Sequence, residues 1–107
     1  MTVSRPEDPI LQDLIHRIVE VADPDRIILF GSWAKGCNRD ASDIDVLVVK
    51  HQADRRDTKA RIYRNLIGLG RAVDVIVVRP EDIERYGDSP SLVLYDALHE
   101  GKEIYAA

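Results

Sequence analysis

Residues 26–49, RIILFGSWAKGCNRDASDIDVLVV, decide the fold. Segment 26–30 is apolar after its arginine and ends at Gly31, which predicts a short strand followed by a tight turn. Segment 43–49 is apolar and mostly β-branched once its two aspartates are passed, as expected of a central strand buried on both faces. A helical turn over 32–36 and a polar loop over 37–42 are predicted to join these two strands.

The flanking segments predict further helices and one more strand. Asp8 followed by Pro9 is typical of a helix start, and apolar residues at helical spacing continue to the helix-breaking sequence DPD at 23–25. Segment 57–69 predicts a helix and segment 72–78 (AVDVIVV) a strand, while 80–86 and 90–100 predict short helices. Together these elements predict a small sheet covered by helices, of the α/β (α+β) class.

Length and composition limit the classes of protein that need to be considered. At 107 residues, the chain is expected to form a single domain over residues 1–107. No apolar run approaches the roughly 20 residues of a membrane span, and the N-terminus has no signal-peptide stretch. We therefore expect no membrane association and a cytoplasmic location. The formal net charge of −4 argues against direct binding of nucleic acid, which usually requires a basic face.

Acidic residues open two of the predicted strands, where a purely structural strand would avoid them. Asp43 and Asp45 are two residues apart, so in an extended chain they share one face at a separation of about 6.5 Å. Asp74 lies near the start of the next strand, and neighbouring strands are about 4.8 Å apart. If these strands pair in the simplest register, the three carboxylates converge on one patch.

Such a patch is unfavourable unless a cation binds to it. Two carboxylates about 6.5 Å apart repel by roughly 2.5 kcal/mol at an effective dielectric constant near 20. A divalent cation reverses the sign of this interaction, and oxygen ligands on a rigid sheet suit Mg²⁺. The three aspartates therefore predict a metal site.

Gly31 and Ser32 follow the first strand and precede the predicted helical turn. Glycine allows a tight turn and a close approach of the backbone to a ligand, and free amides at a helix start attract phosphate. The Ser32 hydroxyl is suited either to donate to a phosphate oxygen or to cap the helix. A phosphate-binding turn beside acidic metal ligands indicates phosphoryl or nucleotidyl transfer.

Gly31-Ser32, ten intervening residues, Asp43-Ile44-Asp45 and a carboxylate on a later strand resemble the signature of the DNA polymerase β-like nucleotidyltransferases. The match is best to their minimal branch, the MNT proteins. The resemblance implies a three-stranded mixed sheet flanked by helices and a mechanism with two Mg²⁺ ions. It implies that Asp43 and Asp45 bind Mg²⁺ and, through it, ATP or another nucleoside triphosphate. Asp74 would complete the metal site and help to deprotonate the attacking hydroxyl.

The resemblance also assigns phosphate contacts. Gly31 and Ser32 would hold the β and γ phosphates of the nucleotide. Lys35 stands where members of the family often have arginine, and it keeps the positive charge but loses the bidentate geometry of a guanidinium. Lys35 is equally compatible with a phosphate contact and with a plain surface position.

Minimal members of the family often pair with a HEPN-domain toxin and transfer AMP from ATP to a tyrosine of that partner. The resemblance therefore implies an antitoxin in a toxin–antitoxin pair, with a possible hetero-oligomer. Two alternatives stay open: an antitoxin that neutralises its toxin by binding alone, and a subunit that modifies a small molecule such as an antibiotic. The acidic residues favour the enzyme, because a pure binding protein gains nothing from charges that repel each other.

Other prominent residues have structural interpretations. Trp33 is suited to stack on a base, but a place in the core or at a partner contact is favoured. The inner side of the helix predicted at 57–69 is expected to carry Ala60, Tyr63, Leu66 and Ile67. A basic stretch in and before that helix is interrupted by acidic residues, and we interpret it as a solvated face. Its members are Arg55, Arg56, Lys59, Arg61 and Arg64.

Overall fold

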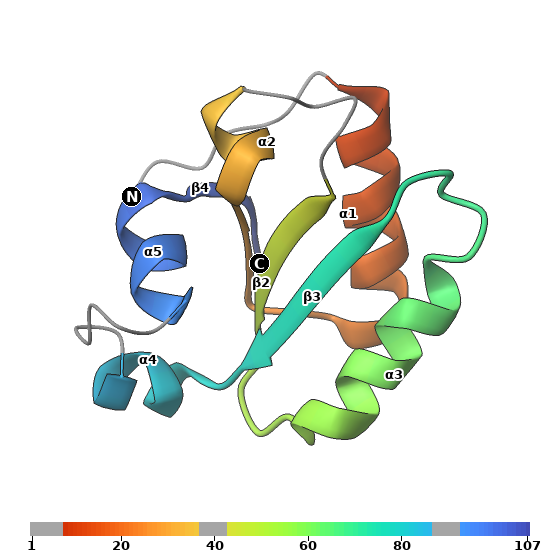
Figure 1. Ribbon diagram of the computed structural model, residues 1–107. Helices are drawn as coiled ribbons and strands as arrows, with labels where there is room; N and C mark the ends of the chain where they lie inside the picture. The colour runs from red at the N-terminus through yellow and green to blue at the C-terminus, as the bar shows by residue number, and fades with distance from the viewer. Residues whose placement is uncertain (1–7, 37–42, 87–92) are drawn as a thin grey trace.

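The computed structural model describes residues 8–36, 43–86 and 93–107, and Figure 1 shows how their helices and strands are arranged. The loop predicted at 37–42 and the first residues of the helix predicted at 90–100 lie outside these ranges. None of the helices in the described ranges is long and apolar enough to cross a membrane. In chain order the elements are α1 (Pro9–Ala22), β1 (Arg26–Phe30), α2 (Gly31–Lys35), β2 (Ile44–Val49), α3 (Arg55–Asn65), β3 (Val73–Val78), α4 (Pro80–Tyr86), α5 (Val93–Glu100) and β4 (Lys102–Ala106).

One sheet forms the centre of the fold, with the strand order β3-β2-β1-β4. Strand β1 runs antiparallel to both β2 and β4, whereas β2 and β3 are parallel. The mixed sheet flanked by helices is therefore confirmed. The prediction of three strands is wrong, because β4 adds a fourth at the edge next to β1.

Strand β4 escapes prediction because its sequence, KEIYA, lacks an alternation of apolar and polar residues. The pairing of β4 with β1 shifts register between Ile27 and Ile28, and two consecutive β4 residues, Glu103 and Ile104, are buried. Burial of Glu103 is tolerated because its Oε2 accepts a hydrogen bond from Nε of Arg26, 2.9 Å away on β1. A cross-strand ion pair thus joins β4 to the sheet.

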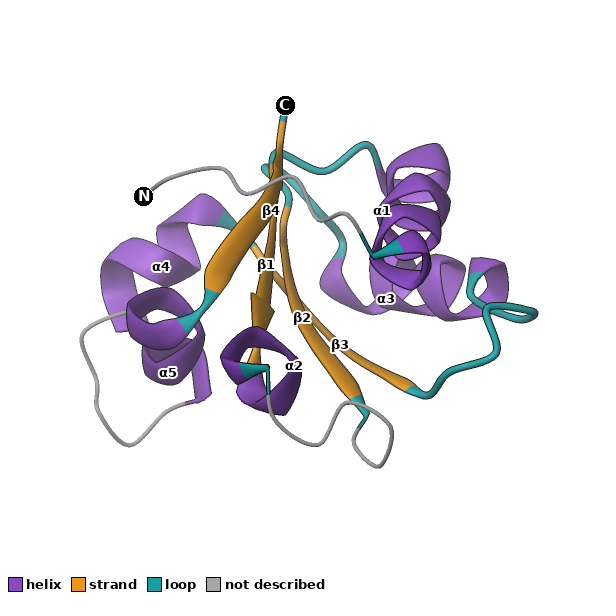
Figure 2. Cartoon of the chain, turned by 90° about the horizontal axis from the view of Figure 1, so that it is seen from above, coloured by secondary structure: helices purple, strands orange, loops and turns teal. Residues whose placement is uncertain are grey.

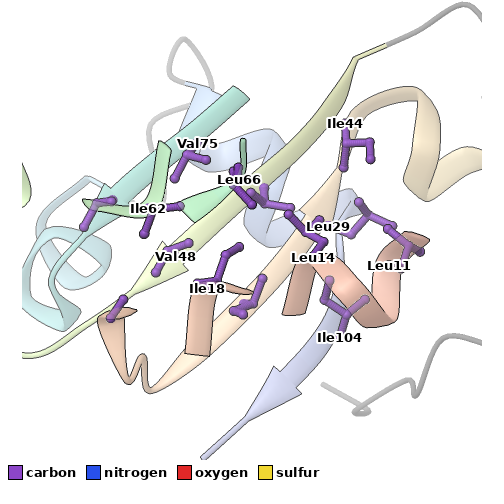
Figure 3. Packing of buried hydrophobic residues seen from close by; sticks show 14 of the residues in the cluster. Leu11, Leu14, Ile18, Leu29, Ile44, Val48, Ile62, Leu66, Val75 and Ile104 are labelled. Carbon is purple, nitrogen blue, oxygen red and sulfur yellow. The ribbon is translucent and has the colours of Figure 1, made fainter. Parts of the chain in front are cut away.

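Helices cover both faces of the sheet, with α1 and α3 on one face and α4 and α5 on the other (Figure 2). Successive residues of a strand point to opposite faces, so each strand contributes to two cores. On β2, Ile44, Val46 and Val48 belong to the larger core under α1 and α3, while Leu47 and Val49 belong to the smaller core under α5. Figure 3 shows how side chains from α1, α3 and the sheet fill the larger core.

Aspartate caps set the starts of α1 and α3. Oδ1 of Asp8 accepts a hydrogen bond from the Ile10 amide at 2.9 Å, and Pro9 occupies the first helical turn, as predicted. Oδ1 of Asp54 accepts a hydrogen bond from the Asp57 amide at 3.1 Å. This cap starts α3 earlier than expected, and the helix also ends earlier, at Asn65.

The predicted inner side of α3 is partly wrong. Leu66 is buried as expected, but Ala60 is exposed and Ile67, beyond the end of the helix, is 79% exposed. Ile62 faces the core instead. Tyr63 is 37% exposed, and its hydroxyl accepts a hydrogen bond from a backbone amide of the edge strand β3 at 2.8 Å. Because most residues of α3 are charged, the few apolar ones define its inner side poorly in the sequence.

Candidate active site

The three predicted carboxylates lie where β2 and β3 begin. The parallel register of these strands pairs Asp45 directly with Asp74. Paired residues on neighbouring parallel strands point to the same face, with the strands about 4.8 Å apart. Asp43 precedes Asp45 by two residues and so belongs to the same face where the chain is extended. The register therefore brings Asp45 and Asp74 together, with Asp43 two residues before Asp45 in the chain.

This acidic patch, defined as Asp43, Asp45 and Asp74, belongs to the face of the sheet that α4 and α5 cover. Two residues after Asp45 on the same strand, Leu47 packs into the core under α5, so both side chains point to that face. Asp45 is partly buried at the rim of that core, whereas Asp43 and Asp74 are exposed. The patch is thus fixed by a rigid sheet and open to a ligand.

The pKa of Asp45 is affected by its burial and by the other two carboxylates of the patch. Burial raises the pKa of the Asp45 carboxyl above its ordinary value, and the negative charges of Asp74 and Asp43 raise that pKa further. The two neighbours are therefore close enough for their charges to act on Asp45. A cation bound among them would remove this repulsion and keep Asp45 ionised.

The three carboxylates of the acidic patch suit Mg²⁺ that is bound together with a phosphate ligand. Within the described residues, none of the three carboxylates makes a hydrogen bond or an ion pair. No group of three Asp, Glu, His or Cys side chains in those ranges is close enough to hold one ion by itself. Mg²⁺ does not require such a cage, because it keeps several waters and binds through one or two carboxylates and the phosphates of a substrate.

Gly31 stands against the acidic patch at the end of β1. Its φ of +70° lies in the left-handed region, and a Cβ atom at this position would collide with Oδ2 of Asp45. Glycine is therefore required both for the turn and for the position of the carboxylate. Ser32 is partly buried and lies inside α2, whose N-cap is Phe30, so the interpretation of Ser32 as a helix cap is wrong.

Lys35 lies beside the patch but is already paired. Its Nζ is 3.4 Å from Oε2 of Glu100 on α5, and both side chains are largely exposed. A pocket of about 230 Å³ lies here, and its lining includes Gly31, Lys35, Asp45, Asp96 and Glu100. Asp96 and Glu100 were not predicted as site residues, although their i, i+4 spacing on the predicted helix places them on one helix face.

Trp33 is 2% exposed and belongs to the larger core, which confirms the favoured interpretation. It anchors α2, and with it the turn at Gly31, to the sheet. The guanidinium of Arg71, in the loop before β3, lies 5.7 Å from the centre of the Trp33 ring. This contact joins the loop that leads to Asp74 to the helix that follows Gly31.

Replacement of Gly31 by alanine is predicted to damage the patch more than the fold. Gly36 has a similar φ of +74°, and a Cβ added there would meet no atom of the described residues within 4 Å, so Gly36→Ala is a matched control for the backbone strain. Each variant should lose about 1 to 2 kcal/mol of unfolding free energy from the positive φ. Only Gly31→Ala should displace the Asp45 carboxylate and weaken Mg²⁺ binding, by about tenfold or more. Calorimetric Mg²⁺ titration tests this, and equal Mg²⁺ affinities of the two variants would contradict it.

Replacement of Asp45 by asparagine is predicted to stabilise the metal-free protein at neutral pH. The raised pKa means that the folded state binds a proton at Asp45 more tightly than the unfolded state does. The free energy of unfolding of the wild type should therefore fall as the pH rises from the ordinary aspartate range through the raised pKa. Asp45→Asn lacks this fall, so its advantage should grow over the same pH range. Urea denaturation with a chelator present measures both, and an Asp45→Asn protein less stable than the wild type at neutral pH would indicate an unseen partner.

Comparisons with known proteins agree with this fold. Residues 12–107 match the family described as Polymerase beta, Nucleotidyltransferase. A crystal structure of a mutant of the toxin–antitoxin MntA–HpeT is similar with a TM-score of 0.61 and 22% identity, over 87% of this chain and 71% of that chain. A protein from Sulfolobus solfataricus, described provisionally as a nucleotidyltransferase, is similar with a TM-score of 0.54 and 21% identity, over 94% of this chain and 90% of that chain.

No curated protein matches the chain in sequence. At their low identities the two crystal structures show the shared fold, and the family match shows the family because it spans most of the residues. The chain belongs to the polymerase beta nucleotidyltransferase family.

Proposed function

We propose that this nucleotidyltransferase uses Mg²⁺ to transfer AMP from ATP to a tyrosine hydroxyl of a HEPN-type toxin, and that it acts as the antitoxin of that toxin. The observation that carries the catalytic part is the register of β2 and β3, which pairs Asp45 with Asp74 next to Gly31. A structural sheet would gain nothing from two like charges at paired positions.

The residues of the acidic patch have different roles in the proposed reaction. Asp43 and Asp45 would hold Mg²⁺, and Asp74 would complete the site. The acceptor hydroxyl oxygen forms a bond to the α-phosphorus of ATP, while the bond from that phosphorus to the pyrophosphate oxygen breaks and pyrophosphate leaves. Asp74, which is exposed, takes the proton of the acceptor hydroxyl. When bound, a pair of Mg²⁺ ions supplies positive charge to the attacking and leaving oxygens.

The turn after β1 provides the proposed contacts for the triphosphate. The backbone at Gly31 carries no side chain between the turn and Asp45, so phosphates can approach both. The hydroxyl of Ser32 is then available as a donor to a phosphate oxygen. Lys35 adds a positive charge, and its exposed ion pair with Glu100 is weak enough for a triphosphate to compete for it.

One observation supports a protein as the acceptor. MntA, which shares the fold, is half of a toxin–antitoxin pair, and the crystallised mutant has two aspartates, two positions apart, changed to glutamate. Asp43 and Asp45 have the same spacing.

The proposal is tested by incubating the purified chain with the protein encoded next to it, ATP and Mg²⁺, followed by intact-mass spectrometry. We expect the neighbouring protein to gain the mass of AMP on a tyrosine. Asp43→Ala should abolish the transfer, while Asp57→Ala, which removes an exposed carboxylate from α3, should leave it unchanged. Loss of toxicity without any mass change would contradict the proposal and select an antitoxin that acts by binding alone.

A further inference from the structure

A second charged site lies at the opposite end of the sheet from the acidic patch. Strands β2 and β3 begin at the acidic patch and end near the starts of α3 and α4, which lie on the other side of the molecule from α2 (Figure 1). A pocket of about 550 Å³ opens there. It is lined by Gln52, Ala53, Asp54, Arg55, Arg56 and Arg79.

The pocket is basic because its acidic neighbours are already engaged. Asp54 caps α3 through the amide of Asp57. Oδ2 of Asp82 accepts a hydrogen bond from the Arg79 amide at 2.9 Å and lies 3.4 Å from Nη1 of Arg55. Asp82 thereby orders the junction of β3 and α4 against α3. Its carboxylate also shows that an oxyanion at the rim can engage Arg55.

Two of the arginines lack an acceptor within the described residues. Nε of Arg79 is a buried side-chain nitrogen without a hydrogen-bond partner in that part of the chain, and the Arg56 side chain makes no ion pair there. A buried donor without a partner costs about 1 to 3 kcal/mol, so native proteins usually satisfy it with water or a ligand. A water molecule would satisfy the Arg79 donor but would leave the positive charges of the pocket unbalanced.

We propose that this pocket binds a phosphate group, either free phosphate or the phosphate of a mononucleotide, through Arg55, Arg56 and Arg79. Several guanidinium groups around one pocket suit a phosphate better than a single carboxylate, because phosphate offers more acceptor oxygens and up to two negative charges. Arg55 and Arg56 are exposed, as predicted for a solvated face, and the proposal gives them a binding role in addition. The pocket is separate from the acidic patch, so the proposal does not depend on catalysis.

The test is calorimetric titration of the whole chain with inorganic phosphate at constant ionic strength, with a chelator present to keep the acidic patch free of metal. We expect saturable binding that Arg79→Gln and Arg56→Gln each weaken by about tenfold or more. Arg61→Gln is the matched control, because it removes the same charge from α3 but lines a different pocket. Thermal melts without phosphate verify that each variant is folded.

Two further titrations test the contact made by Arg79 and distinguish free phosphate from the phosphate of a mononucleotide. Arg79→Lys keeps the charge but lacks Nε, so it should recover only part of the affinity lost in Arg79→Gln. AMP that binds more tightly than phosphate, with an affinity that Arg79→Gln weakens, would assign the site to a mononucleotide, and equal affinities would assign it to free phosphate. The proposal is overturned if phosphate binding does not saturate, if Arg61→Gln weakens it as much as Arg79→Gln, or if Arg79→Lys restores it completely.

Discussion

The parallel pairing of β2 with β3 is the constraint on which the rest of the structure depends. Backbone hydrogen bonds and buried side chains on both faces fix its register, and that register pairs Asp45 with Asp74. The strand pairing holds the two aspartates at neighbouring positions, and burial of Asp45, together with the negative charge of Asp74, raises the pKa of Asp45. The sheet thus holds two carboxylates side by side at its edge, and a bound cation or a proton would remove the repulsion between them. Gly31 extends the same constraint to β1, because only glycine leaves room for the Asp45 carboxylate.

Much of this arrangement could be predicted from the sequence, because the strands around the patch have strong local signals. The apolar runs after Asp45 and Asp74 mark central strands, and the spacing of two between Asp43 and Asp45 fixes their common face. The fourth strand could not be predicted, because burial of Glu103 depends on Arg26, far away in the chain, and on a bulge that breaks the alternation of β4. Such long-range partners leave no local pattern.

The charges of this chain are informative through their positions rather than their sum. A net charge of −4 argues against direct binding of nucleic acid, yet the acidic patch and the basic pocket lie at opposite ends of the parallel strand pair. The acidic end lies beside the positive-φ turn at Gly31 and suits a cation with a triphosphate. The basic end lies where β2 and β3 finish. The basic end could not be assigned from the sequence, because Arg79 lies far from Arg55 and Arg56 in the chain and only the fold brings them together.

The most direct test of the central claim is thermal denaturation of the wild type and of Asp74→Asn, with and without MgATP. A ligand bound only by the folded state raises its melting temperature, so the wild type should be stabilised by a few degrees. Asp74→Asn keeps the size of the side chain at the paired position but removes the charge, and it should lose most of that stabilisation. An equal rise in both proteins, or no rise in either, would contradict a metal–nucleotide site at the paired aspartates.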